Sequence, residues 1–183
     1  MTASQPETIL RLWLPDEGAT LELGRALSSV VLESSISGQP PALLLQGGLG
    51  SGKTTLVRGL AQGLPGGHEA EVSSPSFNIV NLYPTRPPVA HFDLYRVAGQ
   101  APEEFLDAAE DGRTLVVAEW IEHLANNLWP KEALHLRWTP ATTGRAIEIR
   151  ALGSAAGAWL ALLASRTHQW QAAREGAAEG ESR

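Results

Sequence analysis

A glycine-rich segment near residue 50 has the residue types and the spacing of a phosphate-binding loop. Residues 47–54 read GGLGSGKT and fit the pattern G-x-x-x-x-G-K-[ST]. The apolar run ALLLQ precedes the loop and the helix-compatible run TLVRGLA follows it, which is the context that the pattern requires. Glycines let the backbone pass close to phosphates and turn several N–H groups toward them at a helix N-terminus. The sequence therefore predicts a nucleotide-binding site formed by Gly47, Gly48, Leu49, Gly50, Ser51, Gly52, Lys53, Thr54 and Thr55.

Two side chains of this loop have the chemistry to act on phosphates and their metal ion. The Lys53 ammonium group would neutralise the β and γ phosphates, and the Thr54 hydroxyl would ligate Mg²⁺. A nucleotide-bound Mg²⁺ usually also needs an acidic residue at the end of a strand. Glu119 ends the apolar run LVVAE, and Asp93 lies within HFDLYR. Both are candidates for catalysis, and the alternative for each is an ordinary surface carboxylate.

Other residues are weaker candidates for a role at the nucleotide. Ser76, in the segment SSPSF, carries a hydroxyl where P-loop proteins often sense the γ phosphate, although a plain Ser-Pro turn is equally compatible. Trp120 would stack on a base or contact a partner, or else simply pack against the core. Arg58 and Arg96 could approach the phosphates, but no pattern selects either as an arginine finger. The histidines are too scattered for a metal site and are interpreted as surface or packed residues: His68, His91, His123, His135 and His168.

Composition limits the classes of partner. The chain has 183 residues and a formal net charge of −6, without a dense Lys/Arg stripe, so direct RNA binding is not expected. Cysteine is absent, which excludes a disulfide partner and thiolate chemistry. The N-terminal segment lacks a basic patch followed by an apolar stretch, and no apolar run approaches ~20 residues. We therefore expect a cytoplasmic protein without a membrane partner.

Hydrophobic periodicity predicts an α/β fold with a mixed parallel and antiparallel central sheet flanked by helices. We expect a single domain over residues 1–175 and a disordered acidic tail at 176–183. A helix capped near Thr20 follows the first strand. The other expected elements are strands at 9–14, 42–46 and 115–119, hairpins formed by 77–83 with 89–95 and by 133–140 with 145–152, and helices after the loop, at 102–111 and at 155–173.

Four blocks, GGLGSGKTTLVRGL, SSPSFNIV, HFDLYR and VVAEW, in this order and at these separations, resemble the TsaE (YjeE) family. The resemblance implies a P-loop NTPase fold that binds ATP and Mg²⁺. It also implies partnership with the TsaB–TsaD pair, which transfers a threonylcarbamoyl group to tRNA, so that tRNA is contacted only indirectly. The resemblance implies that Thr54 and Glu119 bind Mg²⁺ and that Asp93 belongs to the catalytic site. It also implies that Ser76 carries the hydroxyl of a mobile segment that senses the γ phosphate.

The chain departs from the family pattern at several positions. Gly48 stands where the family usually has aspartate, Ser76 replaces threonine, Ile121 stands where proline follows the E-W pair, and residues 106–112 differ from the usual acidic stretch. We predict a slow ATPase that acts as an accessory subunit of tRNA threonylcarbamoyladenosine formation. The alternatives are a small-molecule or nucleotide kinase, for which no lid-length insertion is visible, and a nucleotide-sensing scaffold without turnover.

Overall fold

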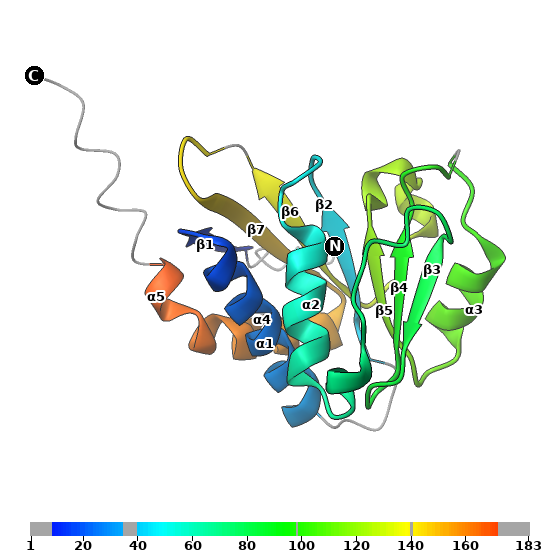
Figure 1. The fold of residues 1–183 in the computed structure, drawn as a ribbon, viewed down its shortest axis with the longest axis horizontal. Coiled ribbons are helices and arrows are strands. Elements are labelled where there is room, and N and C mark those ends of the chain that lie inside the picture. The colour runs from blue at the N-terminus through cyan, green and yellow to red at the C-terminus, as the bar shows by residue number, and fades with distance from the viewer. Residues whose placement is uncertain (1–8, 35–39, 98, 140, 172–183) are drawn as a thin grey trace, which may run out of the picture.

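The protein is described by a computed structural model that covers residues 9–34, 40–97, 99–139 and 141–171. Within this part of the chain, seven strands form one sheet in the order β1-β7-β6-β2-β5-β4-β3 (Figure 1). The strands are β1 (Ile9–Leu14), β2 (Ala42–Gln46), β3 (Val80–Tyr83), β4 (Val89–Asp93), β5 (Leu115–Glu119), β6 (Ala133–Thr139) and β7 (Arg145–Leu152).

The sheet is mixed, as predicted from the sequence. The four central strands, β6, β2, β5 and β4, are parallel to one another. The edges are antiparallel: β3 pairs with β4, and β7 pairs with both β6 and β1. Both predicted hairpins are therefore confirmed. Parallel strands end at the same edge of a sheet, so the loops after β2, β4 and β5 lie together.

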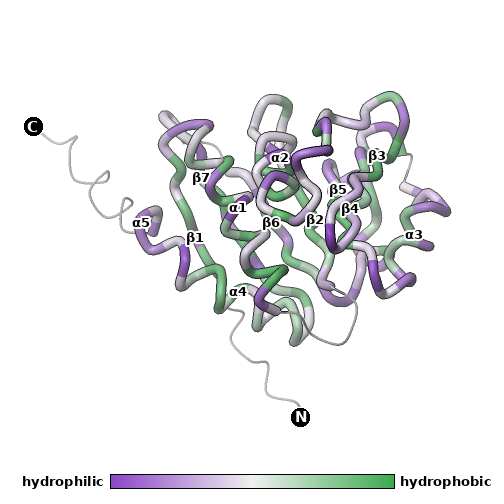
Figure 2. Tube along the Cα trace, turned by 60° about the horizontal axis from the view of Figure 1, so that its bottom comes forward, coloured by the Kyte–Doolittle hydropathy of each residue, from purple (hydrophilic) through white to green (hydrophobic). Residues whose placement is uncertain are grey.

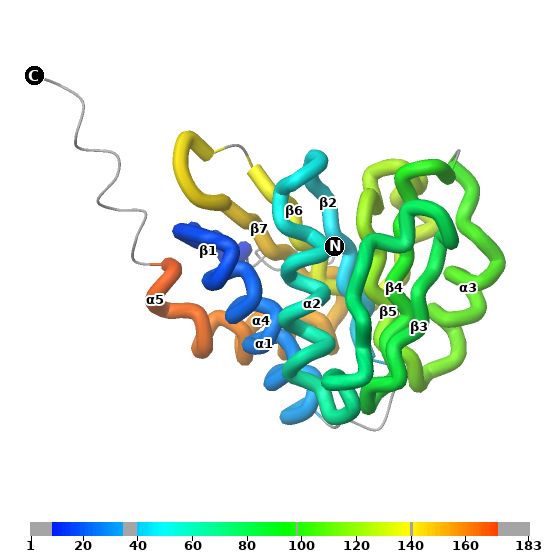
Figure 3. The backbone as a smooth tube through the Cα atoms, in the orientation of Figure 1, coloured from blue at the N-terminus to red at the C-terminus, as the bar shows by residue number. Residues whose placement is uncertain are grey.

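Helices cover both faces of the sheet. They are α1 (Glu17–Glu33), α2 (Lys53–Gly63), α3 (Glu103–Glu110), α4 (Ser154–Arg166) and α5 (His168–Gln171), with 3₁₀ turns η1 (Gly67–Glu69), η2 (Ile121–His123) and η3 (Asn126–Leu128). In Figure 3, α1, α2 and α4 lie close together, whereas α3 lies beside β3 and β4. None of these helices is long and apolar enough to span a membrane, within the described residues.

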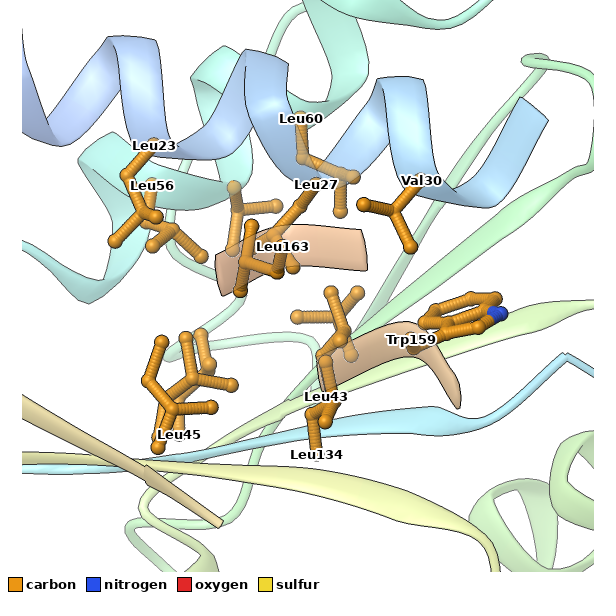
Figure 4. Packing of buried hydrophobic residues seen from close by; sticks show 14 of the residues in the cluster. Leu23, Leu27, Val30, Leu43, Leu45, Leu56, Leu60, Leu134, Trp159 and Leu163 are labelled. Atoms are coloured by element: carbon orange, nitrogen blue, oxygen red, sulfur yellow. The ribbon is translucent and has the colours of Figure 1, made fainter. Parts of the chain in front are cut away.

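Two hydrophobic clusters separate the layers. Leucines of α1 and α2 and Trp159 of α4 pack on one face of β2 and β6 (Figure 4). On the other face, Phe92 of β4 meets Phe105 of α3 edge to face, with ring centroids 5.3 Å apart. Figure 2 shows hydrophobic positions concentrated along the strands and a hydrophilic α5 at the periphery. The clusters hold the central strands, and thus their ends, at a fixed distance from α2.

The structure corrects several expected boundaries. The helix expected near Thr20 begins at Glu17, because the Asp16 carboxylate caps it by accepting from the Ala19 N–H at 2.8 Å. The strand expected at 77–83 begins at Val80, since a turn occupies the residues before it. The strand expected at 89–95 ends at Asp93.

The last helix is also shorter than expected from residues 155–173. It breaks at Thr167, and within the described residues, which end at 171, one further turn, α5, follows. The Thr167 hydroxyl donates to the Leu163 carbonyl at 2.9 Å, a local bond that competes with continued helix. The helix expected at 102–111 is confirmed as α3, one residue shorter at each end. The tail expected at 176–183 lies outside the described residues.

Candidate functional site

The ends of three parallel strands build the site. Residues 47–52 connect β2 to α2, and Asp93 at the end of β4 lies opposite Glu119 at the end of β5. Side chains alternate between the two faces of a strand. His91, Asp93 and Glu119 therefore lie on the face of the sheet that α1 and α2 cover, and Ala90 and Phe92 on the other. This arrangement directs both carboxylates toward the first turn of α2.

The glycine-rich loop has the backbone conformation that its composition predicts. Gly50 and Gly52 have φ angles of 72° and 107°, in the left-handed region that other residues rarely adopt. Gly52 occupies the N-cap of α2 without a side-chain cap, so the first N–H groups of the helix are left for an acceptor outside it. An anion is the acceptor that a helix N-terminus favours.

Lys53 is buried beneath this loop. Its Nζ donates to the Gly47 carbonyl at 2.6 Å and to the Gly48 carbonyl at 3.0 Å, and it lies 3.9 Å from the ring centroid of Trp120. Burial lowers the pKa of Lys53, and the nearby carboxylates, Glu119 foremost, oppose this. Among the described residues no carboxylate forms an ion pair with Lys53. Its hydrogen bonds are therefore to backbone carbonyls, and no carboxylate of these residues occupies the ammonium group.

Thr54 and Glu119 are in direct contact. The Thr54 hydroxyl donates to Glu119 Oε1 at 2.7 Å, and the carboxylate is 3% exposed. The same oxygen lies 2.9 Å from His91 Nε2, on a histidine that is fully buried. A threonine hydroxyl beside a carboxylate at the start of a P-loop helix is a fitting ligand set for Mg²⁺, which takes few protein ligands and completes its shell with phosphate and water.

Asp93 is held by the serine segment. Its Oδ2 accepts from the Ser74 and Ser76 hydroxyls, each at 3.0 Å, and its Oδ1 accepts from the Tyr95 N–H at 2.9 Å. The two serine hydroxyls are 2.7 Å apart. The mobile-segment hydroxyl expected at Ser76 therefore meets the carboxylate predicted to be catalytic, through a contact that the sequence did not suggest.

These groups share one cavity of about 660 Å³. Its walls include most of the predicted residues, from Leu49 through Thr55 together with Ser76, Asp93, Glu119 and Trp120. Gly47 and Gly48 contribute through their carbonyls to Lys53 rather than to the cavity wall. Of the two arginines considered, Arg96 lines the cavity and Arg58 does not. The Arg58 guanidinium instead lies 3.8 Å from the Glu17 carboxylate.

Four cavity residues and one buried residue were not predicted. Glu17, Ser74, Tyr95 and Arg145 line the cavity, and His91 contacts Glu119 from behind. Strand alternation, which puts His91 on the face of Asp93, was a usable signal. No local signal marks Arg145, which reaches the loop from β7. Its Nε would lie 3.1 Å from a Cβ at Gly52.

Trp120 directly follows Glu119 and lines the cavity. It adopts a φ of 61°, which turns the chain sharply after Glu119. Its ring lies 4.9 Å from that of Tyr95 and 5.8 Å from that of His123, measured between centroids. With Lys53 on its face, this ring forms an aromatic wall beside the phosphate loop.

Comparison with known proteins finds relatives of one family. The family model of Threonylcarbamoyl adenosine biosynthesis protein TsaE matches residues 14–147. The TsaE protein of Streptomyces coelicolor is 37% identical over 134 residues, which cover 70% of this chain and 84% of the relative. That of Synechocystis is 37% identical over 124 residues, or 64% and 74% of the two chains.

A solved structure has a similar fold. The crystal structure of Bacillus subtilis YdiB matches with a TM-score of 0.68 and 25% identity, covering 89% of this chain and 99% of YdiB. Residues 14–147, which the family model matches, include the glycine-rich loop, both carboxylates and Arg145. The chain therefore belongs to the TsaE family of threonylcarbamoyl adenosine biosynthesis proteins.

Proposed function

We propose that this protein binds ATP with Mg²⁺ in the 660 Å³ cavity and hydrolyses the γ-phosphate bond as an accessory step of tRNA threonylcarbamoyladenosine formation. The observation that carries the proposal is the convergence of Lys53, the Thr54–Glu119 pair and Asp93 on one cavity. A loop with left-handed glycines at its helix end supplies N–H groups for the phosphates on the same side.

The proposed roles follow from the contacts. Lys53 neutralises the β and γ phosphates, because its charge is not already paired with a carboxylate of the described residues. Thr54 and Glu119 hold Mg²⁺, which would offset the charge that develops on the phosphate oxygens. Asp93, oriented by Ser74 and Ser76, accepts a hydrogen bond from the attacking water and places it in line.

We propose that a protein partner, the TsaB–TsaD pair, docks at the cavity mouth. Exposed apolar side chains surround it: Leu49 is 94% exposed and Tyr95 56% exposed, and both line the cavity. Phe77 is 88% exposed and lies 5.4 Å from the guanidinium carbon of Arg96, another lining residue. Exposed apolar groups of this kind mark contact surfaces. Because the net charge of −6 does not attract nucleic acid, we propose that the protein acts on tRNA only through this partner. We place this assembly in the cytoplasm.

ATP turnover by the isolated chain, with and without TsaB–TsaD, tests the proposal. We expect slow hydrolysis alone and acceleration by the pair, because completing a phosphoryl-transfer site in trans can contribute roughly 10³-fold. Bare tRNA should have little effect. Lys53→Ala should abolish most nucleotide affinity or turnover. Lys131, the chain's other lysine, is exposed and does not line the cavity, so Lys131→Ala should behave as the parent protein.

Three results would contradict the proposal. Equal ATP binding and turnover in folded Lys53→Ala and Lys131→Ala variants would exclude the phosphate-loop role. Stoichiometric phosphorylation of an added nucleoside, nucleotide or sugar, without response to TsaB–TsaD, would assign a kinase instead. Tight ATP binding without any turnover, alone or with the pair, would leave a nucleotide-sensing scaffold.

A further inference from the structure

We propose that His91 and Tyr83 are positioning residues, which orient the Glu119 carboxylate for the metal ion and tie it to the serine segment. The inference rests on the proposed function, because it concerns how Glu119 meets a nucleotide-bound Mg²⁺. Neither residue lines the cavity, so neither would touch the nucleotide. Their effect would pass through Glu119.

The contacts form a continuous chain behind the site. His91 Nε2 lies 2.9 Å from Glu119 Oε1, and His91 Nδ1 lies 3.1 Å from the Tyr83 hydroxyl. That hydroxyl also lies 3.2 Å from the Ser73 carbonyl oxygen, so its single proton is shared between the carbonyl and Nδ1. His91 is fully buried and Tyr83 is 5% exposed, so water does not compete for these bonds.

Hydrogen-bond chemistry explains what His91 does to the carboxylate. An ionised carboxylate only accepts, so the His91 Nε2–H donates to Oε1, the oxygen that the Thr54 hydroxyl also bonds. Two donors on one oxygen fix the rotation of the carboxyl group. Within the described part of the chain, Glu119 Oε2 has no protein donor, and Glu119 lines the cavity. This oxygen is therefore presented to the metal or its waters.

Tyr83 completes the arrangement from the neighbouring edge strand. Its hydroxyl contacts the imidazole on one side and the Ser73 carbonyl on the other. Ser73 directly precedes Ser74, whose hydroxyl holds Asp93. The two carboxylates of the site are thus joined by a continuous path of protein contacts. A side chain that orients a metal ligand typically changes metal affinity 10–100-fold when it is replaced.

A pair of substitutions at one position separates positioning from packing. The amide of Gln reaches the place of the imidazole Nε2, so His91→Gln keeps a donor to Glu119. The shorter amide of His91→Asn reaches only the place of Nδ1 and loses that donor. Tyr83→Phe removes the hydroxyl alone and keeps the ring. His135→Asn is the matched control, because His135 bonds Gln46 and has no contact with Glu119.

The readout is the affinity for a fluorescent ATP analogue in Mg²⁺ and in EDTA, with thermal unfolding as a check on folding. Mg²⁺ should enhance the affinity for the analogue, and we expect His91→Asn to lower this enhancement about 10-fold or more. The affinity in EDTA should change less than about twofold. His91→Gln should retain most of the enhancement, Tyr83→Phe should lose severalfold, and His135→Asn should match the parent protein.

The outcomes distinguish this inference from the proposed function. If the parent protein shows no Mg²⁺-dependent nucleotide binding, the proposed function fails and the inference falls with it. If the parent protein shows that dependence and His91→Asn and Tyr83→Phe keep it unchanged, the inference alone is overturned. Equal losses in the Asn and Gln variants, or parallel losses in EDTA, would assign His91 to packing and overturn it as well.

Discussion

The close crossing of α1 and α2 predicts that Gly59→Ala will destabilise the protein. A Cβ at Gly59 would lie 2.1 Å from the Leu21 carbonyl oxygen, and one at Gly24 would lie 2.3 Å from the Leu56 carbonyl oxygen. An unstrained carbon-to-oxygen contact is about 3.3 Å or longer. The obstacle is backbone in both cases, so the helices must separate by roughly 1 Å to accept one methyl group.

The magnitude follows from two opposing effects. Overpacking of this kind costs about 1–3 kcal/mol, and a rigid backbone obstacle places the cost toward the upper end. The higher helix propensity of alanine returns up to about 1 kcal/mol. We therefore expect a net loss of about 2 kcal/mol in the free energy of unfolding. For a chain of this size, that corresponds to a fall in melting temperature of roughly 4–8 °C.

Urea and thermal unfolding of the Gly59→Ala and Gly157→Ala variants test this reasoning. The two variants carry the same chemical change, at two glycines that both lie in helices. Nothing lies within 4 Å of a Cβ at Gly157 in α4, so that variant should be stabilised by up to about 1 kcal/mol. Since α2 begins with Lys53 and Thr54, Gly59→Ala should also weaken nucleotide binding. A parent-like or stabilised Gly59→Ala protein would refute the crossing argument.

Three further predictions concern other parts of the molecule. Asp93→Asn should retain nucleotide affinity and lose turnover; a parent rate of ATP hydrolysis would exclude a catalytic role. Burial lowers the pKa of His135 in the folded protein, so the unfolded chain takes up a proton first as the pH falls below about 6.5. His135→Gln should therefore lose less stability than the parent protein between about pH 7.5 and about pH 5 in urea titrations, and parallel losses would contradict this. The Glu132 carboxylate accepts from two backbone N–H groups at the start of α4, so Glu132→Gln should cost about 1 kcal/mol in the same titrations, and an unchanged midpoint would show that this cap is not stabilising.

The sequence predicted the parts of the fold that local patterns determine. The unalternated apolar runs identified β2 and β5 as buried central strands, and the two hairpins made the sheet mixed. The glycine-rich loop carries its own context, so its position after β2 followed from spacing alone. Two helix boundaries failed where a single side chain decided them. The Asp16 cap moved the start of α1, and Thr167 divided the last helix.

The predicted site residues were found in one place for a topological reason. Asp93 and Glu119 end neighbouring parallel strands, and their register puts them opposite each other beside the loop. The pairing of Asp93 with Ser74 and Ser76 and the approach of Arg145 depend on how separate segments pack, which a single sequence does not reveal. Tertiary contacts of this kind, unlike strand ends, carry no local signature.

Backbone strain also concentrates at this site. Ile79 and Trp120 are the non-glycine residues of the described chain with positive φ, at 66° and 61°. Such a conformation costs of order 1–3 kcal/mol and persists only where its surroundings determine it. The Ile79 carbonyl accepts from the Asp93 N–H at 2.9 Å, and the Trp120 ring lies against Lys53. Ile79 therefore bonds the backbone of Asp93 and Trp120 contacts the side chain of Lys53, so the contacts that accompany the unfavourable backbone also hold the chain of one proposed functional residue and the ammonium group of the other.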